Sequence, residues 1–391
     1  MIDRAFVPLD SVAEALGAGD IAGTLAGTGV EVVRNGSRGL LWAEPMVEVA
    51  HDGRRTAYGP VDRADATRLD ELELGPVDEL LAGQTRLIFG NCGRHAPTDL
   101  EAYRAEGGFG TSLSNPQAII DEIRESGLRG RGGAGFPAHI KWQTVADTEA
   151  DQRYVVVNAD EGDSGTFADR LIIEGDPYLL IEGMRIAGHA VGATKGIVYL
   201  RSEYPIAAAV LGEAIEIARA DGILGPDFDV ELFVGAGAYI CGEETSMLES
   251  LEGRRGEIRA KPPLPAVSGL FGRPTLVHNV ITLCAVPWIV RHGGAAYAKM
   301  GVGSSTGTMP FQLAGNVKRG GLYELEFGVT LGELVNDWGG GTRSGRPVRA
   351  VQVGGPLGAY LTPEHFDIPM SYETLREVGA EVGHEIGRAH V

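Results

Sequence analysis

The stretch SGLRGRGGAGFP, residues 126–137, contains the pattern G-x-G-x-x-G at Gly130, Gly132 and Gly135. In a dinucleotide-binding fold this pattern follows a strand and opens a helix. Here the apolar spacing of NPQAIIDEIRESG, residues 115–127, predicts a helix directly before the pattern, so the usual dinucleotide-loop interpretation does not apply. Five glycines in twelve residues still allow backbone N–H groups to approach an anionic or planar ligand, although a flexible turn has the same composition.

Alternating strand and helix patterns follow the glycine stretch. Strands are predicted at residues 154–162, 196–201 and 230–235, with helices over 177–192 and 205–222 between them. Such alternation indicates a parallel sheet that is covered on both faces. The predicted fold class is therefore α/β.

The N-terminal part of the chain has a different pattern. Residues 1–95 predict a β-α-β-β order, which suits a thioredoxin-like domain, with a helix over 10–26, a strand at 30–35 and a hairpin turn at 52–53. This domain lacks a redox cysteine pair, so we expect a structural or interaction role for it. Residues 60–114 are mixed and polar, which indicates a linker region with short helices.

The character of the sequence changes again near the C-terminus. Residues 306–365 combine short strand patterns, the helical segment LGELVNDW (331–338) and the loop GGGTRSGRP. We interpret this region as a compact β-grasp-like module. Residues 366–384 are expected to begin the connection to a further domain.

The composition excludes several classes of function. Lys and Arg number 34 against 53 Asp and Glu, which leaves a net charge of −19 that repels nucleic acid and anionic membranes. The sequence contains no apolar run as long as a membrane span, and its first residues do not follow the plan of a signal peptide. Its three cysteines, Cys92, Cys241 and Cys284, form no C-x-x-C pair. We therefore expect a soluble cytoplasmic protein without a cysteine metal site of its own.

Polar residues gather where a predicted strand ends. Asn158, Asp160, Glu161 and Asp163 lie where the predicted strand that begins at residue 154 ends and a loop begins, and ligands of open α/β sheets bind beyond the carboxyl ends of strands. These side chains suit ribose hydroxyls or the polar edge of a ring. The alternative is a turn with helix-capping acids.

A second group lies in GAGAYICGEET, residues 235–245. Gly242 would lie against a ligand and Glu243 and Glu244 at its rim, whereas acids in a first helical turn also simply favour the helix dipole. Cys241 is expected to be a buried small residue, because no histidine lies near it in sequence.

A third group lies in the proline- and glycine-rich residues 261–282, which are expected to form an extended loop with His278 and Asn279 as polar contacts. A lone histidine is more often structural than catalytic. The sequence contains no H-E-x-x-H motif, Walker A motif or nucleophile–base pair. Together with the basic residues of the glycine stretch, these groups indicate a flavin or nucleotide site at the edge of a parallel sheet.

Taken in order, these motifs resemble one family. SGLRGRGGAGFP, NADEGDSGTF, GAYICGEET, KPPLPA and FGRPT are similar to motifs of the flavin-binding, 51-kDa-type subunit of NADH dehydrogenases, over about residues 100–384. The segment VEVVRNGSRGLLWAEPMVEV, together with RSEYP, GTMPFQLAGN and VRAVQVGGPLGAYL, resembles the beta subunit of molybdenum-containing, NAD-dependent formate dehydrogenases. In that family a thioredoxin-like domain is fused in front of the flavin domain.

The resemblance implies FMN and NAD(H) as cofactors. It implies an FMN/NAD-binding domain over residues 96–305 and an SLBB-type β-grasp-like module over 306–365. The glycine stretch and Lys141 would hold FMN, and Phe136 would reach the adenine of NAD(H). Hydride would pass directly between the nicotinamide and the flavin, without a catalytic side chain and with Glu244 in a tuning role. The residues implied to contact a cofactor are Gly130, Arg131, Gly132, Gly133, Gly135, Phe136, Lys141, Asn158, Asp160, Glu161, Asp163, Tyr239, Gly242, Glu243, Glu244, His278, Asn279 and Thr282.

The implied partners are an iron–sulfur gamma-type subunit and a molybdenum-containing alpha subunit of a formate dehydrogenase. Because the flavin motifs are shared, the same module in a respiratory NADH dehydrogenase or an NAD-coupled hydrogenase is the alternative. A catalytically silent scaffold is a further alternative, of a different class.

The sequence departs from the family pattern in three places. His278-Asn279 replaces two asparagines, and since histidine still donates one hydrogen bond, we expect binding to survive with a changed pH dependence. Thr144 and Leu264 stand where respiratory enzymes carry aromatic residues. The family continues into a helical domain whose cysteines bind a 4Fe–4S cluster, whereas this sequence ends in EIGRAHV. This heptapeptide resembles a translated sequencing adapter, and we expect residues 385–391 to be non-native.

Overall fold

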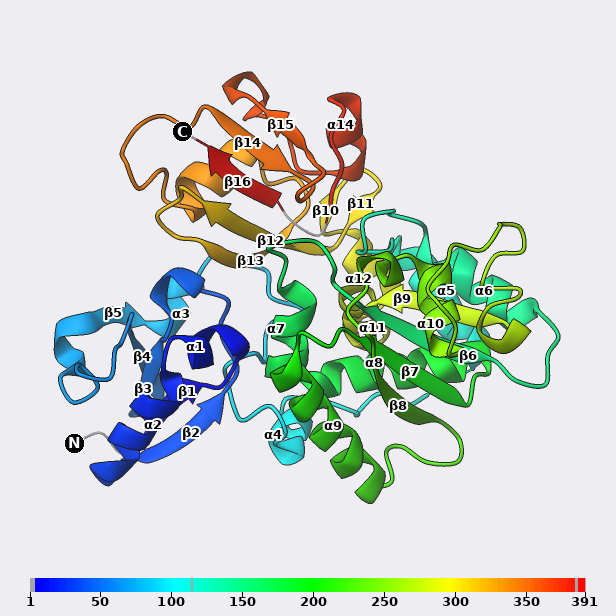
Figure 1. Ribbon diagram of the computed structural model, residues 1–391, viewed down its shortest axis with the longest axis horizontal. Helices are drawn as coiled ribbons and strands as arrows, with labels where there is room; N and C mark the ends of the chain where they lie inside the picture. The colour runs from blue at the N-terminus through cyan, green and yellow to red at the C-terminus, as the bar shows by residue number, and fades with distance from the viewer. Residues whose placement is uncertain (1–3, 114, 384–385, 391) are drawn as a thin grey trace.

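The computed structural model describes residues 4–113, 115–383 and 386–390, the last five by their backbone alone. In Figure 1 the chain forms an N-terminal domain (β1–β5, blue), a central domain (α4–α12, mainly green) and a C-terminal module (β10–β16, yellow to red). Among the described residues, no helix is both long and apolar enough to cross a membrane.

The N-terminal domain is built on a five-stranded sheet with the order β2-β1-β3-β4-β5, in which β1 is parallel to β2 and antiparallel to β3. The predicted β-α-β-β order is present, and the predicted turn at Asp52 and Gly53 joins β3 to β4 with positive φ angles at both residues. The predicted helix over 10–26 is divided at Gly17. The elements are β1 (Arg4–Pro8), α1 (Ser11–Ala15), α2 (Ala18–Gly27), β2 (Glu31–Asn35), β3 (Val47–His51), β4 (Arg54–Tyr58), β5 (Glu73–Pro76) and α3 (Val77–Leu80).

The central domain contains a four-stranded parallel sheet with the order β8-β7-β6-β9. Successive side chains of β6 point to opposite faces: Val155 and Val157 enter the large core that holds α8 and α11, whereas Val156 packs with Met247 and Leu248 of α10. This confirms a parallel sheet covered on both faces. The elements are α4 (Leu100–Ala105), α5 (Pro116–Ser126), α6 (Ala138–Asp147), β6 (Tyr154–Ala159), α7 (Ala168–Gly175), α8 (Pro177–Val191), β7 (Lys195–Leu200), α9 (Pro205–Ala220), β8 (Asp229–Val234), α10 (Glu244–Leu251), β9 (Thr275–Asn279), α11 (Val280–His292) and α12 (Gly294–Ala298).

Two features of the central domain differ from the prediction. The region 261–282 is an extended loop only in its first part, because it ends in strand β9 and the first turn of α11. Helix α7 was not predicted, since its apolar residues directly precede those of α8 and the two share Asp176 as their boundary.

The C-terminal module has a sheet with the order β13-β12-β16-β14-β15. The predicted helix 331–338 is present as α13 followed by a π-type turn, and Thr330 and Glu333 form a capping box at its start. The backbone of β16 lies between β12 and β14, whereas residues 384, 385 and 391 are outside the described part of the chain, so the expected non-native tail stays a prediction. The elements are β10 (Gly301–Val302), β11 (Ser305–Thr306), β12 (Thr308–Gly315), β13 (Gly321–Glu326), α13 (Leu331–Glu333), β14 (Ala350–Val353), β15 (Ala359–Leu361), α14 (Tyr372–Glu377) and β16 (Ile386–His390).

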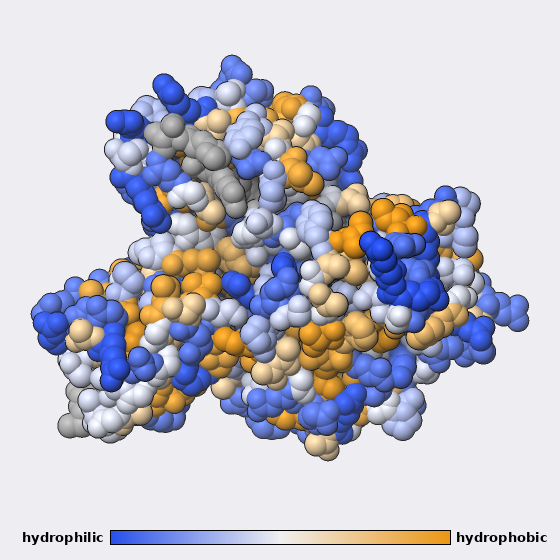
Figure 2. Space-filling view, viewed as in Figure 1, coloured by the Kyte–Doolittle hydropathy of each residue, from blue (hydrophilic) through white to orange (hydrophobic). Residues whose placement is uncertain are grey.

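Buried polar contacts join the three parts. The Glu324 carboxylate, on β13, accepts hydrogen bonds from the backbone N–H groups of residues 87–89 at 2.9–3.1 Å and from the Thr308 hydroxyl at 2.7 Å. The Glu174 carboxylate, on α7, accepts from the backbone N–H of Ser11 at 2.9 Å. On the face shown in Figure 2, hydrophilic residues dominate the outer rims of the lobes and hydrophobic patches lie toward the middle. The central domain is therefore held between two docked neighbours.

Candidate cofactor site

The candidate site lies where the strand order of the central sheet reverses. Chain order runs from β6 outward to β7 and β8 and then returns to β9 on the other side of β6. Ligands of open α/β sheets bind at this switch point, beyond the carboxyl ends of the strands. Asn158 and Asn279 are register partners at these two strand ends. The sheet thus brings together two groups of residues that are more than 100 positions apart in the sequence.

The glycine stretch is fixed beside the start of helix α11. The backbone N–H of Arg131 donates to Thr282 Oγ1 at 2.9 Å, and the backbone N–H of Gly130 donates to the Phe136 carbonyl at 2.8 Å. Gly135 has a φ of +59°, and a Cβ there would lie 2.9 Å from the Tyr372 ring, so both backbone and space require glycine. The loop is therefore a defined structure rather than a flexible turn.

The side chain of Arg131 does not face the switch point. It is 2% exposed, and its guanidinium donates to the Tyr297 hydroxyl at 3.0 Å and the Thr306 carbonyl at 2.7 Å, above the Phe327 ring. These partners belong to α12 and the C-terminal module. The guanidinium thus holds the joint between domains, whereas the backbone of Arg131 belongs to the glycine loop, where its predicted cofactor contact stays a prediction.

The start of α11 offers a donor that has no partner. Asn279 caps the helix, with its Oδ1 accepting from the backbone N–H of Thr282 at 3.1 Å and from the Thr282 hydroxyl. Its Nδ2 is buried and has no hydrogen-bond partner among the described residues. A buried amide without an acceptor is costly, and a helix N-terminus with backbone donors favours an anion. This end of the site therefore fits a phosphate group.

His278 is held by a side chain of helix α6. The Nε1–H of Trp142, on α6, donates to His278 Nε2 at 2.9 Å. Burial, and secondarily the positive charge of Lys141, lowers the pKa of His278 to about 3. The imidazole consequently stays neutral at physiological pH, so the expected change in the pH dependence of binding does not follow from this histidine.

The acidic group after β6 divides into two roles. Asn158 Nδ2 donates to the Gly242 carbonyl at 2.7 Å, which ties the end of β6 to the turn before α10. Asp160 is buried next to the same glycine, and a Cβ on Gly242 would lie 3.3 Å from its carboxylate. Burial raises the pKa of Asp160 to about 6, against the opposing charge of Arg201. Asp160 thus remains a candidate for ligand contact.

Glu161 has its carboxylate turned to the protein. It accepts from the backbone N–H groups of Asp169 and Arg170 at 2.8 and 3.0 Å, and from the hydroxyls of Thr166 and Tyr204 at 3.2 and 3.0 Å. All four donors stabilise the N-terminal end of α7 and its neighbours. These contacts favour the helix-capping alternative for the Glu161 side chain, and its contact with a cofactor stays a prediction.

Two aromatic rings, one in the glycine stretch and one in the turn before α10, are exposed, and we call this exposed part of the site its open side. Phe136 is 42% exposed and Tyr239 is 61% exposed, and the Tyr239 hydroxyl donates to Asp163 Oδ1 at 2.8 Å. Exposed aromatic rings next to a glycine-rich loop suit a planar ligand. Gly132, within that loop, is exposed as well.

Two lysines and two glutamates form a chain of alternating charges at the start of α10. Lys141 Nζ lies 3.1 Å from Glu244, and Lys261 Nζ lies 2.8 Å from Glu244 and 2.9 Å from Glu243. The pKa values of Glu243 and Glu244 are lowered although burial opposes this, because the lysines and local hydrogen bonds favour the ionised form. Lys261 was not predicted as a site residue; the only signal for it was a basic residue at the head of KPPLPA.

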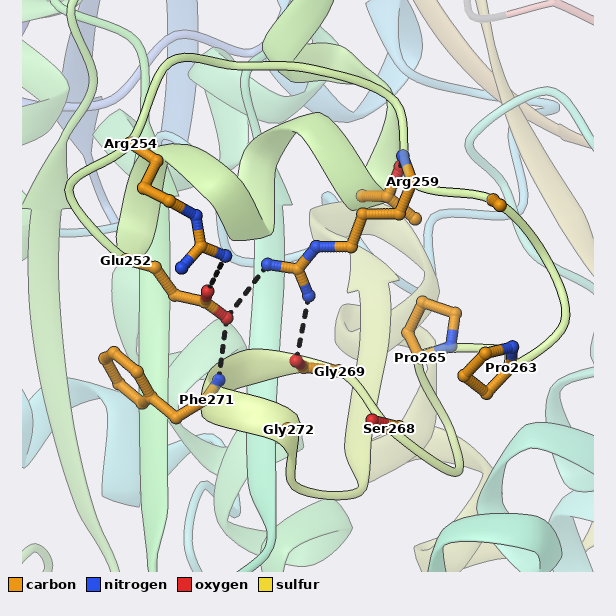
Figure 3. A pocket seen from close by; sticks show the side chains of 11 residues that line it. Glu252, Arg254, Arg259, Pro263, Pro265, Ser268, Gly269, Phe271 and Gly272 are labelled. Carbon is orange, nitrogen blue, oxygen red and sulfur yellow. Dashed lines mark hydrogen bonds and ion pairs between the residues drawn. The ribbon is translucent and has the colours of Figure 1, made fainter.

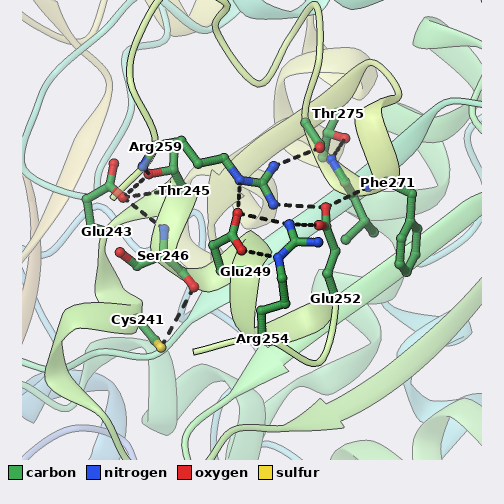
Figure 4. A network of polar contacts seen from close by, with 12 residues as sticks. Cys241, Glu243, Thr245, Ser246, Glu249, Glu252, Arg254, Arg259, Phe271 and Thr275 are labelled. Carbon is green, nitrogen blue, oxygen red and sulfur yellow. Dashed lines mark hydrogen bonds and ion pairs between the residues drawn. The ribbon is translucent and has the colours of Figure 1, made fainter. Parts of the chain in front are cut away.

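The loop that carries Lys261 is fixed by a second network of ion pairs. Arg259 lies 2.5 Å from Glu249 and 2.9 Å from Glu252, and its guanidinium donates to the Gly269 carbonyl at 2.9 Å. Figure 4 shows Arg254 and Arg259 facing the two glutamates beside α10. Glu252, Arg254 and Arg259 also line a cavity of about 560 Å³ (Figure 3). Since its arginines are paired with glutamates, we assign this network to positioning the loop.

Hydrogen bonds and an ion pair link the elements that carry the predicted residues, whose contacts with a cofactor stay predictions. Direct contacts connect the glycine stretch to α11, α6 to α10, and the end of β6 to the turn at residues 239–242. The side chains of Arg131 and Glu161 serve the domain joint and helix α7 instead.

Comparisons with known proteins agree with this geometry. Residues 123–288 match the family of the Nuo51 FMN-binding domain. The NADP-reducing hydrogenase subunit HndC of Solidesulfovibrio fructosivorans is 45% identical over 303 residues, which cover 75% of this chain and 62% of that protein. A subunit of the NADH-quinone oxidoreductase of Salmonella typhimurium is 44% identical over 313 residues, which cover 74% of this chain and 70% of that protein.

A solved structure extends the likeness over nearly the whole chain. A chain of an NAD+-reducing [NiFe]-hydrogenase in the air-oxidized state aligns with a TM-score of 0.64 and 31% identity, over 98% of this chain and 68% of that chain. The sequence relatives and the solved structure indicate the same protein family. The chain belongs to the Nuo51 flavoprotein family, with an FMN-binding domain like that of its NADH-quinone oxidoreductase relatives.

Proposed function

We propose that this chain binds FMN at the switch point and NAD(H) on its open side, as the NAD-reducing flavoprotein subunit of a larger oxidoreductase. The observation that carries the proposal is the buried, unpartnered amide of Asn279 at the start of α11, beside the glycine loop. The phosphate group of a ligand would supply the hydrogen-bond acceptor that this amide lacks. Family membership makes FMN the ligand of choice.

The residues present fit the two ends of FMN. The backbone of the glycine loop, the N-terminus of α11 and Asn279 would hold the phosphate. Asn158, Asp160 and the turn at Gly242 would surround the ring system. A buried carboxylate with a raised pKa offers either an acceptor or, when protonated, a donor to the polar edge of the ring. None of these groups needs to act as an acid or base on the substrate.

When bound, FMN accepts or donates a hydride at the nicotinamide and exchanges electrons singly with iron–sulfur centres. The chain's own task is to position the two planar ligands and to exclude water. Phe136 and Tyr239 would supply stacking surface for NAD(H). Lys141 and Lys261, each paired with Glu244, would orient its polar groups.

The finer proposal is that the whole enzyme is a formate dehydrogenase, with an iron–sulfur gamma-type subunit and a molybdenum-containing alpha subunit as partners. It is supported by the resemblance of the N-terminal and C-terminal motifs to that family. The alternative is an NAD-coupled hydrogenase or a respiratory enzyme. A hydrogenase chain aligns over 98% of this chain, so the N-terminal domain alone does not separate the alternatives.

Two experiments test the flavoprotein proposal and the identity of the whole enzyme separately. The full chain, purified after addition of FMN, is expected to absorb in the visible range with one flavin per chain and to reduce an artificial dye with NADH. Failure to take up FMN would contradict the flavoprotein proposal. For the partners, the tagged chain is isolated from its native cells and metals are measured. Molybdenum supports a formate dehydrogenase, nickel a hydrogenase, and neither metal a respiratory enzyme.

A further inference from the structure

The contact between Trp142 and His278 lies outside the cofactor contacts assigned above. Trp142 is fully buried on α6, and His278, at the end of β9, is 5% exposed. The indole Nε1–H donates to His278 Nε2 at 2.9 Å, with the ring planes inclined at 47°. An indole N–H is a donor only, so the direction of this hydrogen bond is fixed by chemistry.

This direction determines the protonation of the imidazole. Because Nε2 accepts, it carries no proton, and the proton of the neutral ring lies on Nδ1. The charged form is disfavoured by burial and by Lys141, which approaches from α6, the same helix as Trp142. His278 therefore keeps one defined donor, the Nδ1–H, and the next residue of the chain, Asn279, carries the unpartnered amide at the start of α11.

We propose that Trp142 is a positioning residue, which locks His278 in its neutral Nδ1–H tautomer so that the ring donates to an oxygen of the ribityl phosphate of FMN. This inference rests on the proposed function. It explains how histidine can replace an asparagine here. An asparagine amide is always a donor, whereas a histidine without a fixed partner divides its proton between two nitrogens.

The tautomer is tested in the FMN-free full chain by nitrogen NMR of labelled histidine. The expected result is a protonated Nδ1 and an unprotonated Nε2 for His278, unchanged between pH 5 and 8. The reverse tautomer, or a charged ring in this range, would overturn the proposal. This measurement needs no variant, so it remains decisive if a substitution at the buried Trp142 fails to fold.

Trp142→Phe keeps an aromatic ring and removes the donor. The two His278 tautomers are then expected to interconvert, and the Kd for FMN, measured by flavin fluorescence, to rise about tenfold. In a His278→Asn background the same substitution is expected to have little further effect, since asparagine has no tautomers. An unchanged Kd and tautomer in Trp142→Phe would refute the positioning role.

Trp288→Phe is the matched control. Trp288 also packs against a histidine, His292, with ring centroids 4.4 Å apart, but the two rings are stacked and the ring nitrogen of His292 bonds the Trp288 carbonyl. This variant is expected to leave the Kd for FMN unchanged. If wild-type protein binds no FMN at all, the proposed function fails, while the tautomer measurement still decides whether Trp142 fixes His278.

Discussion

Asn279→Asp separates the two contributions of this side chain. In the structure, Asn279 Oδ1 caps α11 through Thr282, while Nδ2 is the buried donor without a partner. Aspartate keeps the capping oxygen and replaces the donor with a second, negatively charged oxygen. Because Asp and Asn are equally good caps and an acid favours a helix N-terminus, the FMN-free protein is expected to keep or slightly raise its Tm.

The expected cost falls on FMN binding. Losing a hydrogen bond to a charged group removes roughly 1.5–3 kcal/mol. Repulsion between a carboxylate and a phosphate about 4 Å apart adds about 4 kcal/mol at an effective dielectric constant near 20. At 1.4 kcal/mol per tenfold change, the Kd for FMN is expected to rise at least about 1,000-fold.

Fluorescence titration with FMN measures the Kd, and calorimetry of the FMN-free protein measures the Tm. Asn115→Asp is the control, because Asn115 caps α5 in the same way, accepting from the backbone N–H of Gln117 at 2.9 Å. It is expected to change neither quantity. An Asn279→Asp protein that binds FMN with wild-type affinity would refute the assignment of this amide to the phosphate.

Three further predictions concern the loop, the charge chain and a buried carboxylate. Gly132→Leu is expected to abolish FMN binding with the fold intact, as read by flavin absorbance and circular dichroism; full FMN occupancy would show that the loop is not the flavin site. Lys261→Met removes the cation shared by two glutamates, and we expect a higher KM for NADH in dye reduction with unchanged FMN content; an unchanged KM would exclude Lys261 from the NAD(H) site. Burial raises the pKa of Glu44 from 4.5 to about 8. The contribution of protonated Glu44 to the free energy of unfolding is therefore fully present below pH 4.5 and is lost as pH rises toward 8, by at most about 1.4 kcal/mol per pH unit. Glu44→Gln should flatten the pH dependence of the free energy of unfolding between pH 4.5 and 8. An unchanged pH dependence would show that the pKa of Glu44 is not raised.

Local signals were sufficient for much of the fold. The helix 115–127 ends at Gly127 in the left-handed conformation, and Pro205 occupies the first turn of α9, as their sequence patterns indicate. The turn at 52–53 and the strands β6, β7 and β8 also follow directly from short patterns. In each case the residues that determine the structure are neighbours in the chain.

The parts that were not predicted depend on distant partners. Tyr297 and Thr306, which bind the Arg131 guanidinium, are 166 and 175 positions away from it. The last donor to Glu161, the Tyr204 hydroxyl, is 43 positions away. A basic residue in a glycine loop and an acid after a strand look the same in sequence whether they face a ligand or the protein. Only the fold decides between these two environments.

A comparison of FMN with riboflavin tests the central claim most directly. The two flavins share the ring and ribityl chain and differ in the phosphate, which is the group assigned to the glycine loop, Asn279 and the start of α11. Titration of the wild-type chain is expected to show one FMN per chain and at least about 100-fold weaker binding of riboflavin. Equal affinity for the two flavins, or no binding of either, would contradict a phosphate site at the switch point.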